Sequence, residues 1–384
     1  MTKYFALIAV LSILVGCSDK PTRKDVQLIK TTFYTLKNFD NDDMLSAYNA
    51  FIKSCDAVAE QRGEFLGLGE IKINRRDYLT VCSQARTIMP SKFREFIQSN
   101  FTPYLVTYKG NEQGKFTAYY EAEIKASKVR DDIYKYPVYG RPYDMVDFNP
   151  KDFDETLPSK KIIGRVDNGK LVPYYTRAEI NAQGVNAPVL LWADSNIDVY
   201  IMQIQGSAVA IMPDGSRIRI AFAESNGHPF KGIGSILLGK GLLEKGQASM
   251  GNVKKWLKDN PGLASANMNE NKRYIFHRLG DPEGPVGALG VPLIAGRSLA
   301  VDKEYIPLGA LLWLETTKPD GEEINRLVVA QDIGSAIKGA VRGDYFWGSG
   351  GDDILEEAGK MNSIGKYYIL IPNKLEGIDD KKNK

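Results

Sequence analysis

The last third of the chain alternates short apolar segments with closely spaced Gly and Pro, and this pattern limits the folds open to it. The candidate strands are Tyr274–Phe276, Ser298–Val301, Leu311–Leu314, Arg326–Ala330 and Tyr367–Pro372. Many short strands with turns this close favour a small β-barrel over a sheet built from strand–helix–strand units. We therefore predict a mainly β fold in which a barrel occupies the C-terminal third.

The first hundred residues have a different, helical pattern. Asn38–Asp43 is a helix-start signal, and apolar positions recur at helical spacing after it. Arg75–Met89 shows the same spacing, as does Ser91–Gln98, where Ser91 is placed as an N-cap. The sequence thus predicts an α+β protein with a helical N-terminal segment.

The middle of the chain is again rich in strand signals. Short strands are predicted at Phe116–Glu121, Val189–Trp192, Val199–Ile204, Ala208–Met212 and Arg217–Phe222. A short helix is predicted to begin after Thr176, because Glu179 at the third position completes a capping box.

The N-terminus carries a targeting signal. Lys3 precedes the apolar run Tyr4–Val15, which is too short to span a membrane, and Cys17 follows directly after Gly16. This arrangement resembles a bacterial lipobox, in which the cysteine is lipidated and becomes the first residue of the mature chain. By resemblance to the sorting rule of Gram-negative lipoproteins, Ser18 rather than Asp in the next position favours the outer membrane over the inner. The sequence therefore predicts an outer-membrane lipoprotein that faces the periplasm, held by lipid chains on Cys17.

Cysteine and histidine usage limits the other kinds of site. The chain has three Cys and two His, without the usual spacing of a zinc site, so no metal or cofactor is predicted. Lipidation of Cys17 leaves Cys55 and Cys82, which an envelope compartment permits to form a disulfide, but the residues alone leave the bond open. The net charge of +3 is small and no basic run is interleaved with aromatic residues, so nucleic acid is not an expected partner.

The candidate chemistry lies within Leu327–Gly350. An apolar run precedes Asp332, and Asp344 lies twelve residues later, just before the aromatic residues Tyr345–Trp347. Two acids in a Gly-rich frame beside aromatic rings suit an acid/base site that holds a sugar. Spacing alone does not rank the two acids, and an Asp after a strand also commonly caps a turn.

These residues match a known family. The segments Pro285–Trp313 and Val328–Gly350 resemble the C-terminal three-aspartate domain of the membrane-bound lytic murein transglycosylase A (MltA) family. The three acids of that pattern fall on Asp302, Asp332 and Asp344. Three upstream segments resemble the other motifs of the family in the same order, namely Phe116–Ser127, Gln203–Ala208 and Ser225–Gly234.

The resemblance implies a double-psi β-barrel domain with a second β-domain inserted into it and a groove between the two. On this sequence the signal and lipobox cover residues 1–17, and the N-terminal helical part of the barrel domain covers residues 18–120. The inserted β-domain would run over residues 121–265. The C-terminal barrel domain would cover residues 266–373, and residues 374–384 would form a tail.

The resemblance also implies a peptidoglycan lytic exotransglycosylase, which cleaves the β-1,4 bond between N-acetylmuramic acid and N-acetylglucosamine and leaves 1,6-anhydro ends. It assigns the acid/base role to Asp344 and a supporting role to Asp332. Candidate contacts to the glycan are Thr117, Tyr119, Tyr120, Gln205, Gly206, Ser207 and Lys338. For Asp302, a turn-capping role is the favoured interpretation.

Two other functions fit the same residues. The first is a two-carboxylate muramidase that uses Asp344 and Asp332 to activate water. The second is a lipid-anchored protein that binds peptidoglycan without cleaving it.

Overall fold

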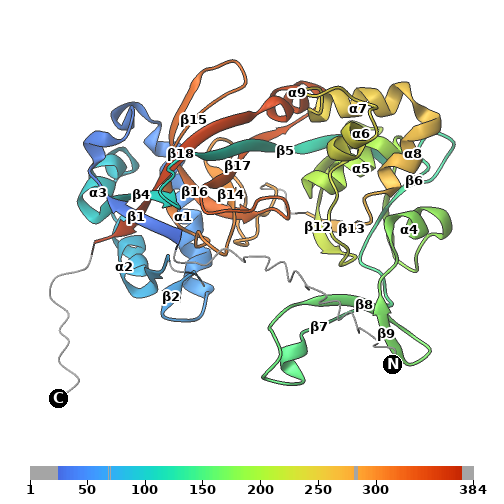
Figure 1. Cartoon of the computed structure of the whole chain (residues 1–384), viewed down its shortest axis with the longest axis horizontal. Coiled ribbons are helices and arrows are strands. Elements are labelled where there is room, and N and C mark those ends of the chain that lie inside the picture. The colour runs from blue at the N-terminus through green and yellow to red at the C-terminus, as the bar shows by residue number, and fades with distance from the viewer. Residues whose placement is uncertain (1–24, 68, 70, 281–283, 374–384) are drawn as a thin grey trace, which may run out of the picture.

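The computed structural model describes residues 25–67, 69, 71–280 and 284–373. The predicted signal with Cys17 and the tail at 374–384 lie outside the described residues. Within the described part of the chain, no helix is long and apolar enough to cross a membrane. The architecture is mixed α+β and mostly β, as the sequence predicts (Figure 1).

Three helices and two pairs of strands form one end of the molecule (Figure 1). The helices are α1 (Met44–Glu60), α2 (Arg75–Ala85) and α3 (Phe93–Asn100), and the strands are β1 (Val26–Lys30), β2 (Phe65–Leu66), β3 (Ile73–Asn74) and β4 (Phe101–Tyr108). The helix-start signal is confirmed, because the Asp43 side chain accepts hydrogen bonds from the backbone of Leu45 and Ser46. Cys55 on α1 and Cys82 on α2 form a disulfide, which settles the pairing that the sequence left open.

Six strands form a closed circuit beside these helices. They are β5 (Gly114–Ser127), β14 (Ser298–Val301), β15 (Leu311–Thr317), β16 (Glu323–Ile333), β17 (Arg342–Gly350) and β18 (Asn362–Pro372). The pairings run from β5 through β17, β14, β16 and β15 to β18, and the first half of β18 pairs with β5 again. Large side chains such as Trp313 and Tyr367, both fully buried, fill the core against α1 and α2.

The middle of the chain builds the other half of the molecule. Its strands are β6 (Tyr136–Tyr139), β10 (Val189–Ala193), β11 (Ala208–Ile211), β12 (Arg217–Ser225) and β13 (Ile275–Leu279). Its helices are α4 (Arg177–Gln183), α5 (Asn196–Gln205), α6 (Ile233–Gly239), α7 (Met250–Asp259) and α8 (Pro261–Asn269), with α9 (Asp352–Lys360) packed on α7. A separate three-stranded sheet of β7 (Met145–Phe148), β8 (Ile162–Asp167) and β9 (Lys170–Pro173) projects from this half (Figure 1).

One strand prediction in this half is wrong. Val199–Ile204, predicted as a strand, forms most of helix α5. Ser195 caps this helix through a hydrogen bond from the Asp198 backbone nitrogen (3.2 Å), and Gly206 ends it in the left-handed conformation. The predicted capping box of Thr176 and Glu179 is confirmed at the start of α4.

Strand β5 belongs to both halves. Its first half pairs with β17 and β18, and its second half pairs with β11 and β10. Strand β17 follows β5 past the junction, since Ser349 and Gly350 still pair with Glu121 and Ala122. The two halves are thus joined by β5 itself and by its pairing with β17, which shifts register between Phe346 and Ser349.

Candidate active site

The two candidate acids lie at the same level of the sheet, on strands that flank β14. Ala300 of β14 pairs with Asp332 of β16 on one side and with Asp344 of β17 on the other. Strands lie about 4.8 Å apart, so the Cα atoms of the two acids are roughly 10 Å apart. The fully buried run Leu327–Ala330 anchors β16 in the core and leaves Asp332 at its end.

The side chain of Asp344 has one hydrogen-bond partner among the described residues. The hydroxyl of Thr117, its direct neighbour on β5, donates to Asp344 Oδ1. Arg342 Nη2 in turn donates to Thr117 Oγ1 (2.7 Å). Burial raises the pKa of Asp344, and the Thr117 hydroxyl and the nearby Arg342 and Lys115 charges oppose this rise.

Asp332 is held by three donors. Its Oδ1 accepts from the backbone nitrogens of Ala288 (3.0 Å) and Ile333 (2.9 Å), and its Oδ2 accepts from the Tyr119 hydroxyl (2.9 Å). Burial nevertheless raises the pKa of Asp332 to about 6. Both oxygens are thus occupied by protein groups, which fixes the orientation of this carboxyl.

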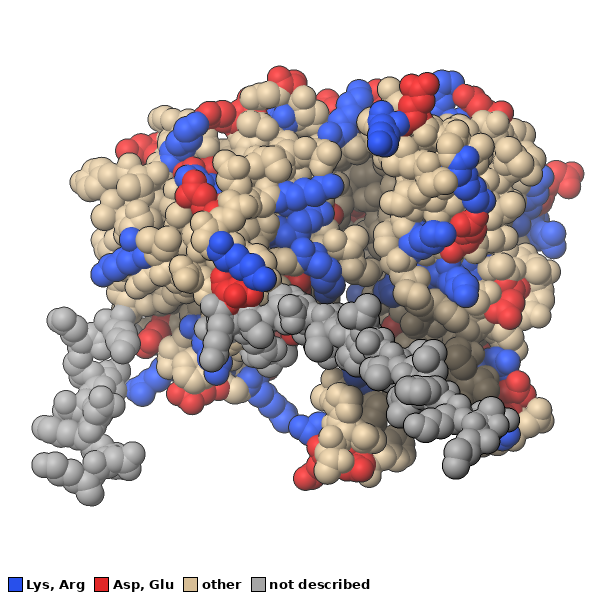
Figure 2. Space-filling view, viewed as in Figure 1, with Lys and Arg blue, Asp and Glu red and all other residues tan. Residues whose placement is uncertain are grey.

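Both acids open onto a groove of about 690 Å³ between the two halves of the molecule. Figure 2 shows the surface hollowed between these halves, with Lys and Arg side chains on both sides. The charged residues that line the groove are Arg177, Arg273, Arg278, Lys303, Lys338, Arg342, Asp332 and Asp344. Apart from Lys338 and the two acids, sequence reasoning missed these residues, because no motif or spacing distinguishes such cations from solvated surface charges.

The aromatic residues after Asp344 do not all face the groove. Phe346 shares the face of Asp344, lines the groove and lies 5.2 Å from the Tyr119 ring between centroids. Tyr345 points to the opposite face, where its hydroxyl bonds to the Gly296 carbonyl oxygen (3.2 Å). Trp347 packs beside Tyr345 and donates to Glu357 (3.1 Å). Of the three aromatic residues that follow Asp344, Phe346 is therefore the one that lines the groove.

The structure brings most of the predicted glycan contacts into the groove. Its lining includes Thr117, Tyr119, Gln205, Gly206, Ser207 and Lys338. Tyr120 is the exception: it is 4% exposed and packs in the core of the inserted half with Ala122 and Ile124. Because neighbouring strand residues face opposite sides, Tyr119 and Tyr120 cannot both reach the groove.

Asp302 and Lys338 pair with each other rather than with the two groove acids. Asp302 is 3% exposed and accepts from the backbone nitrogens of Glu304 (3.2 Å) and Gly339 (2.9 Å). The Lys338 ammonium lies 3.6 Å from Asp302 Oδ1. The turn-capping interpretation of Asp302 is confirmed.

The arrangement suits acid/base chemistry on a bound polar ligand. A carboxyl with a raised pKa can hold a proton near neutral pH and deliver it to a leaving oxygen. Asp332 in its fixed orientation can stabilise a positive charge that develops between the two acids. The hydroxyl, amide and ring groups along the walls are of the kinds that can hydrogen-bond to and stack on a polar ring ligand.

Comparison with known proteins gives consistent matches. The model of the MltA specific insert domain matches residues 115–278, and that of the 3D domain matches residues 297–371. The chain is 33% identical to MltA from Neisseria gonorrhoeae, whose crystal structure superimposes with a TM-score of 0.79 and 92% and 94% coverage of this chain and that one. The membrane-bound lytic murein transglycosylase from Agrobacterium tumefaciens is 29% identical, with a TM-score of 0.78 and coverages of 90% and 98%. Membrane-bound lytic murein transglycosylase A of Escherichia coli is 27% identical over 383 residues, covering 96% of this chain and 95% of its own.

Proposed function

The chain belongs to the MltA family of lytic murein transglycosylases, and on this premise we propose how its own residues perform the reaction. The substrate is peptidoglycan, and the bond cleaved is the β-1,4 linkage between N-acetylmuramic acid and N-acetylglucosamine. The product is a glycan strand that ends in a 1,6-anhydro muramyl ring. The groove above Asp332 and Asp344 is the site of cleavage.

Asp344 is the single acid/base. In its protonated form it donates to the glycosidic oxygen, and the bond from C1 to that oxygen breaks with development of an oxocarbenium-like charge. The resulting carboxylate then accepts the proton of the muramyl 6-hydroxyl, whose oxygen closes onto C1. Asp344 is therefore protonated again at the end of the cycle, and no water is consumed.

The observation that carries this assignment is the unequal hydrogen bonding of the two acids. Within the described chain, Asp344 bonds only to Thr117 through Oδ1, so its Oδ2 is free to exchange a proton with the substrate. Asp332 uses both oxygens for protein donors, which favours a fixed carboxylate that stabilises the charge at C1. The cations on both walls of the groove suit a polymer whose peptide substituents carry carboxylates.

The two-acid muramidase is the second candidate, and the observation in its favour is the spacing of the two acids. With Cα atoms roughly 10 Å apart, the two carboxyls are compatible with the roughly 6.5–9.5 Å separation that inverting hydrolases need for a water molecule. Product mass separates the candidates, because anhydro-muropeptides are lighter by one water and have no reducing end. Finding only reducing-end products would exclude the transglycosylase reaction.

The Asp344→Asn variant tests the acid/base and the non-catalytic alternative together. Turnover of purified peptidoglycan should fall at least 100-fold, while sedimentation with insoluble sacculi stays unchanged. Asp320→Asn, an equivalent change in an exposed hairpin turn, serves as the matched control. An unchanged rate in Asp344→Asn would remove Asp344 from the mechanism, and no cleavage by the unmodified protein would favour a binding role alone.

We also propose the finer features that the family resemblance implies. The closed circuit of β5, β14, β15, β16, β17 and β18 is the double-psi β-barrel, and residues 121–265 form the inserted domain. The family name supports association with the cell envelope. Lipidation at Cys17 would hold the protein at the outer membrane, facing the periplasm, and incorporation of radiolabelled palmitate that Cys17→Ser abolishes is the test.

A further inference from the structure

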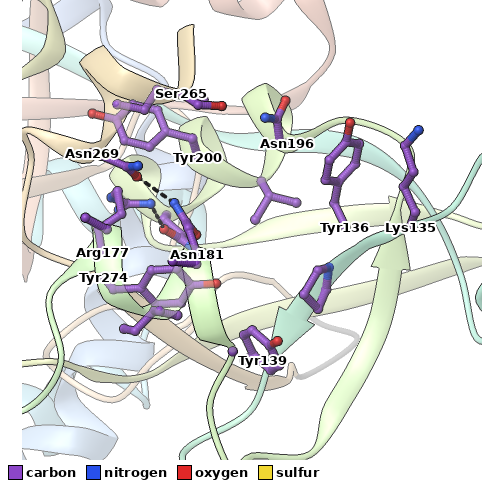
Figure 3. Close-up of a pocket in the computed structure, with 18 of the residues that line it drawn as sticks. Lys135, Tyr136, Tyr139, Arg177, Asn181, Asn196, Tyr200, Ser265, Asn269 and Tyr274 are labelled. Atoms are coloured by element: carbon purple, nitrogen blue, oxygen red, sulfur yellow. Dashed lines mark hydrogen bonds between the residues drawn. The ribbon is translucent and has the colours of Figure 1, made fainter.

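A second cavity of about 590 Å³ lies inside the inserted half and is not used by the proposed reaction. It is enclosed by β6, β10, α4, α5 and α8 (Figure 3). Arg177 and Gln203 line both this cavity and the groove, so the pair forms part of the wall between them. All the other residues that line the cavity are absent from the groove.

The charges that line this cavity are all positive. Arg130, Lys135 and Arg177 line it, and no Asp or Glu does. Arg130 and Lys135 have no ion pair with another described residue, and they lie over the rings of Trp192 (5.3 Å) and Tyr136 (5.7 Å). Uncompensated cations at the rim of a concave surface attract an anionic ligand.

Arg177 is the strongest sign of a missing counter-charge. Only 3% of this residue is exposed, and it lies between the rings of Tyr200 (4.5 Å) and Tyr274 (5.1 Å), as Figure 3 shows. Its three hydrogen bonds go to neutral acceptors, namely Gln203 Oε1 (2.6 Å) and the backbone oxygens of Asn271 (3.1 Å) and Arg273 (2.6 Å).

A buried cation without a carboxylate partner is unfavourable, and burial lowers the pKa of Arg177. A guanidinium has five N–H donors, of which these bonds use three. An entering carboxylate would supply both the missing negative charge and an acceptor.

The remaining walls suit a peptide. Tyr136, Tyr139 and Trp192 present aromatic surface from β6 and β10, against which small apolar side chains can pack. Amide side chains also line the cavity, including Asn196 and the hydrogen-bonded pair of Asn181 and Asn269 (2.7 Å, Figure 3). Amide groups pair with peptide N–H and C=O groups as both donors and acceptors.

We propose that this cavity binds a carboxylate-bearing short peptide, the stem peptide of peptidoglycan, as a site separate from the glycan groove. The identity of the peptide rests on the proposed function, because stem peptides are the peptides that accompany this substrate. They carry free carboxyl groups and alanine side chains, which match the cations and the aromatic wall. Gln203, shared by both cavities, makes the wall of the groove sensitive to occupation of this site.

The test is calorimetric titration of the purified protein with free stem tetrapeptide. We expect saturable binding that weakens at least tenfold when the peptide carboxyls are amidated. The Arg130→Gln/Lys135→Gln variant should also bind at least tenfold more weakly, and its exposed positions make misfolding an unimportant concern. The Lys30→Gln/Arg62→Gln variant removes the same charge from exposed positions in the N-terminal part and should bind like the unmodified protein.

Either of two results would overturn the inference: absence of tetrapeptide binding, or binding that neither amidation nor the Arg130/Lys135 substitutions weaken. Cleavage of purified peptidoglycan by the unmodified protein is measured in parallel. Cleavage without tetrapeptide binding rejects this inference alone, whereas absence of cleavage rejects the proposed function and leaves the titration as a separate result.

Discussion

Replacing Thr117 by Val should move the pH profile of cleavage upward. Thr117 donates to Asp344 Oδ1, and a hydroxyl donor stabilises the charged carboxylate more than the neutral acid. The reaction begins with protonated Asp344, so the rate falls as pH rises past the pKa of this carboxyl. Without the donor that pKa rises further, and the protonated form persists to higher pH.

The size of the effect follows from the hydrogen bond lost. A hydrogen bond to a charged group contributes roughly 1.5–3 kcal/mol, and 1.36 kcal/mol corresponds to one pH unit, so the alkaline limb should move up by about 1–2 pH units. Valine keeps the shape of threonine. Arg342 loses its hydrogen bond to Thr117 Oγ1 but keeps the one to the Lys115 carbonyl oxygen (3.3 Å). The assay is kcat/KM for release of anhydro-muropeptides, measured by mass spectrometry from about pH 4 to pH 9.

Tyr119→Phe is the matched comparison, because it removes the hydroxyl donor of Asp332 instead. If Asp344 carries the proton, the alkaline limb should move in Thr117→Val and stay within about 0.3 pH units in Tyr119→Phe. The reverse pattern would refute the assignment and make Asp332 the proton carrier. An alkaline limb that moves down in Thr117→Val would refute the electrostatic reasoning itself.

Three further predictions concern stability. Burial raises the pKa of Asp332 to about 6 in the folded protein from an ordinary 3.8, so the stability of the protein falls as pH rises through that window. In urea unfolding, Asp332→Asn should therefore raise the free energy of unfolding by up to roughly 3 kcal/mol at pH 7 and by little at pH 4. An equal increase at both pH values would contradict this. Asp42→Ala should lower the free energy of unfolding, measured by thermal unfolding, by about 3–5 kcal/mol, because buried Arg297 donates to both Asp42 carboxylate oxygens (2.7 and 2.8 Å) and would lose its partner. The double variant Asp42→Ala/Arg297→Met should recover most of this loss. Cys55→Ser/Cys82→Ser removes a disulfide between positions 27 residues apart and should lower the free energy of unfolding by about 3–4 kcal/mol, while cleavage of peptidoglycan at 25 °C persists. Loss of activity in a folded variant would contradict this and show that the disulfide shapes the groove.

Local signals were sufficient wherever one short segment decides the structure. The capping box of Thr176 and Glu179 marked the start of α4, and Asp43 marked the start of α1. Both predictions depend on side chains that bond to their own backbone within a few residues. Such contacts depend on residues that are close together in the sequence, which is why sequence alone identifies them.

Segments buried on several sides were harder to assign. Val199–Ile204 is a short apolar run rich in β-branched and aromatic residues, and its periodicity does not distinguish a buried strand from a buried helix. The deciding signal was Ser195, with Asp198 at the third helical position, and it lies outside the run. For Tyr120, strand alternation alone should have excluded a place in the groove once Tyr119 was assigned to it.

The relative placement of the two acids could not be predicted from spacing. Asp332 and Asp344 lie level because both pair with Ala300, a residue more than thirty positions away in the sequence. This register depends on how β14 inserts between β16 and β17, which is a property of the assembled sheet rather than of any local segment. The family resemblance identified the two acids, whereas their hydrogen-bond partners are evident only in the folded structure.

Strand β5, which runs without a break through both halves of the molecule, has a mechanical consequence. A hinge that opened the groove would have to bend β5 together with its pairing to β17 and β11, and this resists separation of the two walls. If the two walls do not part between cuts, we expect a bound polymer to slide along the groove rather than to be released after each cut. We therefore expect successive cuts along one strand before the enzyme moves to another, so that early in digestion some strands are fully degraded while others are still intact.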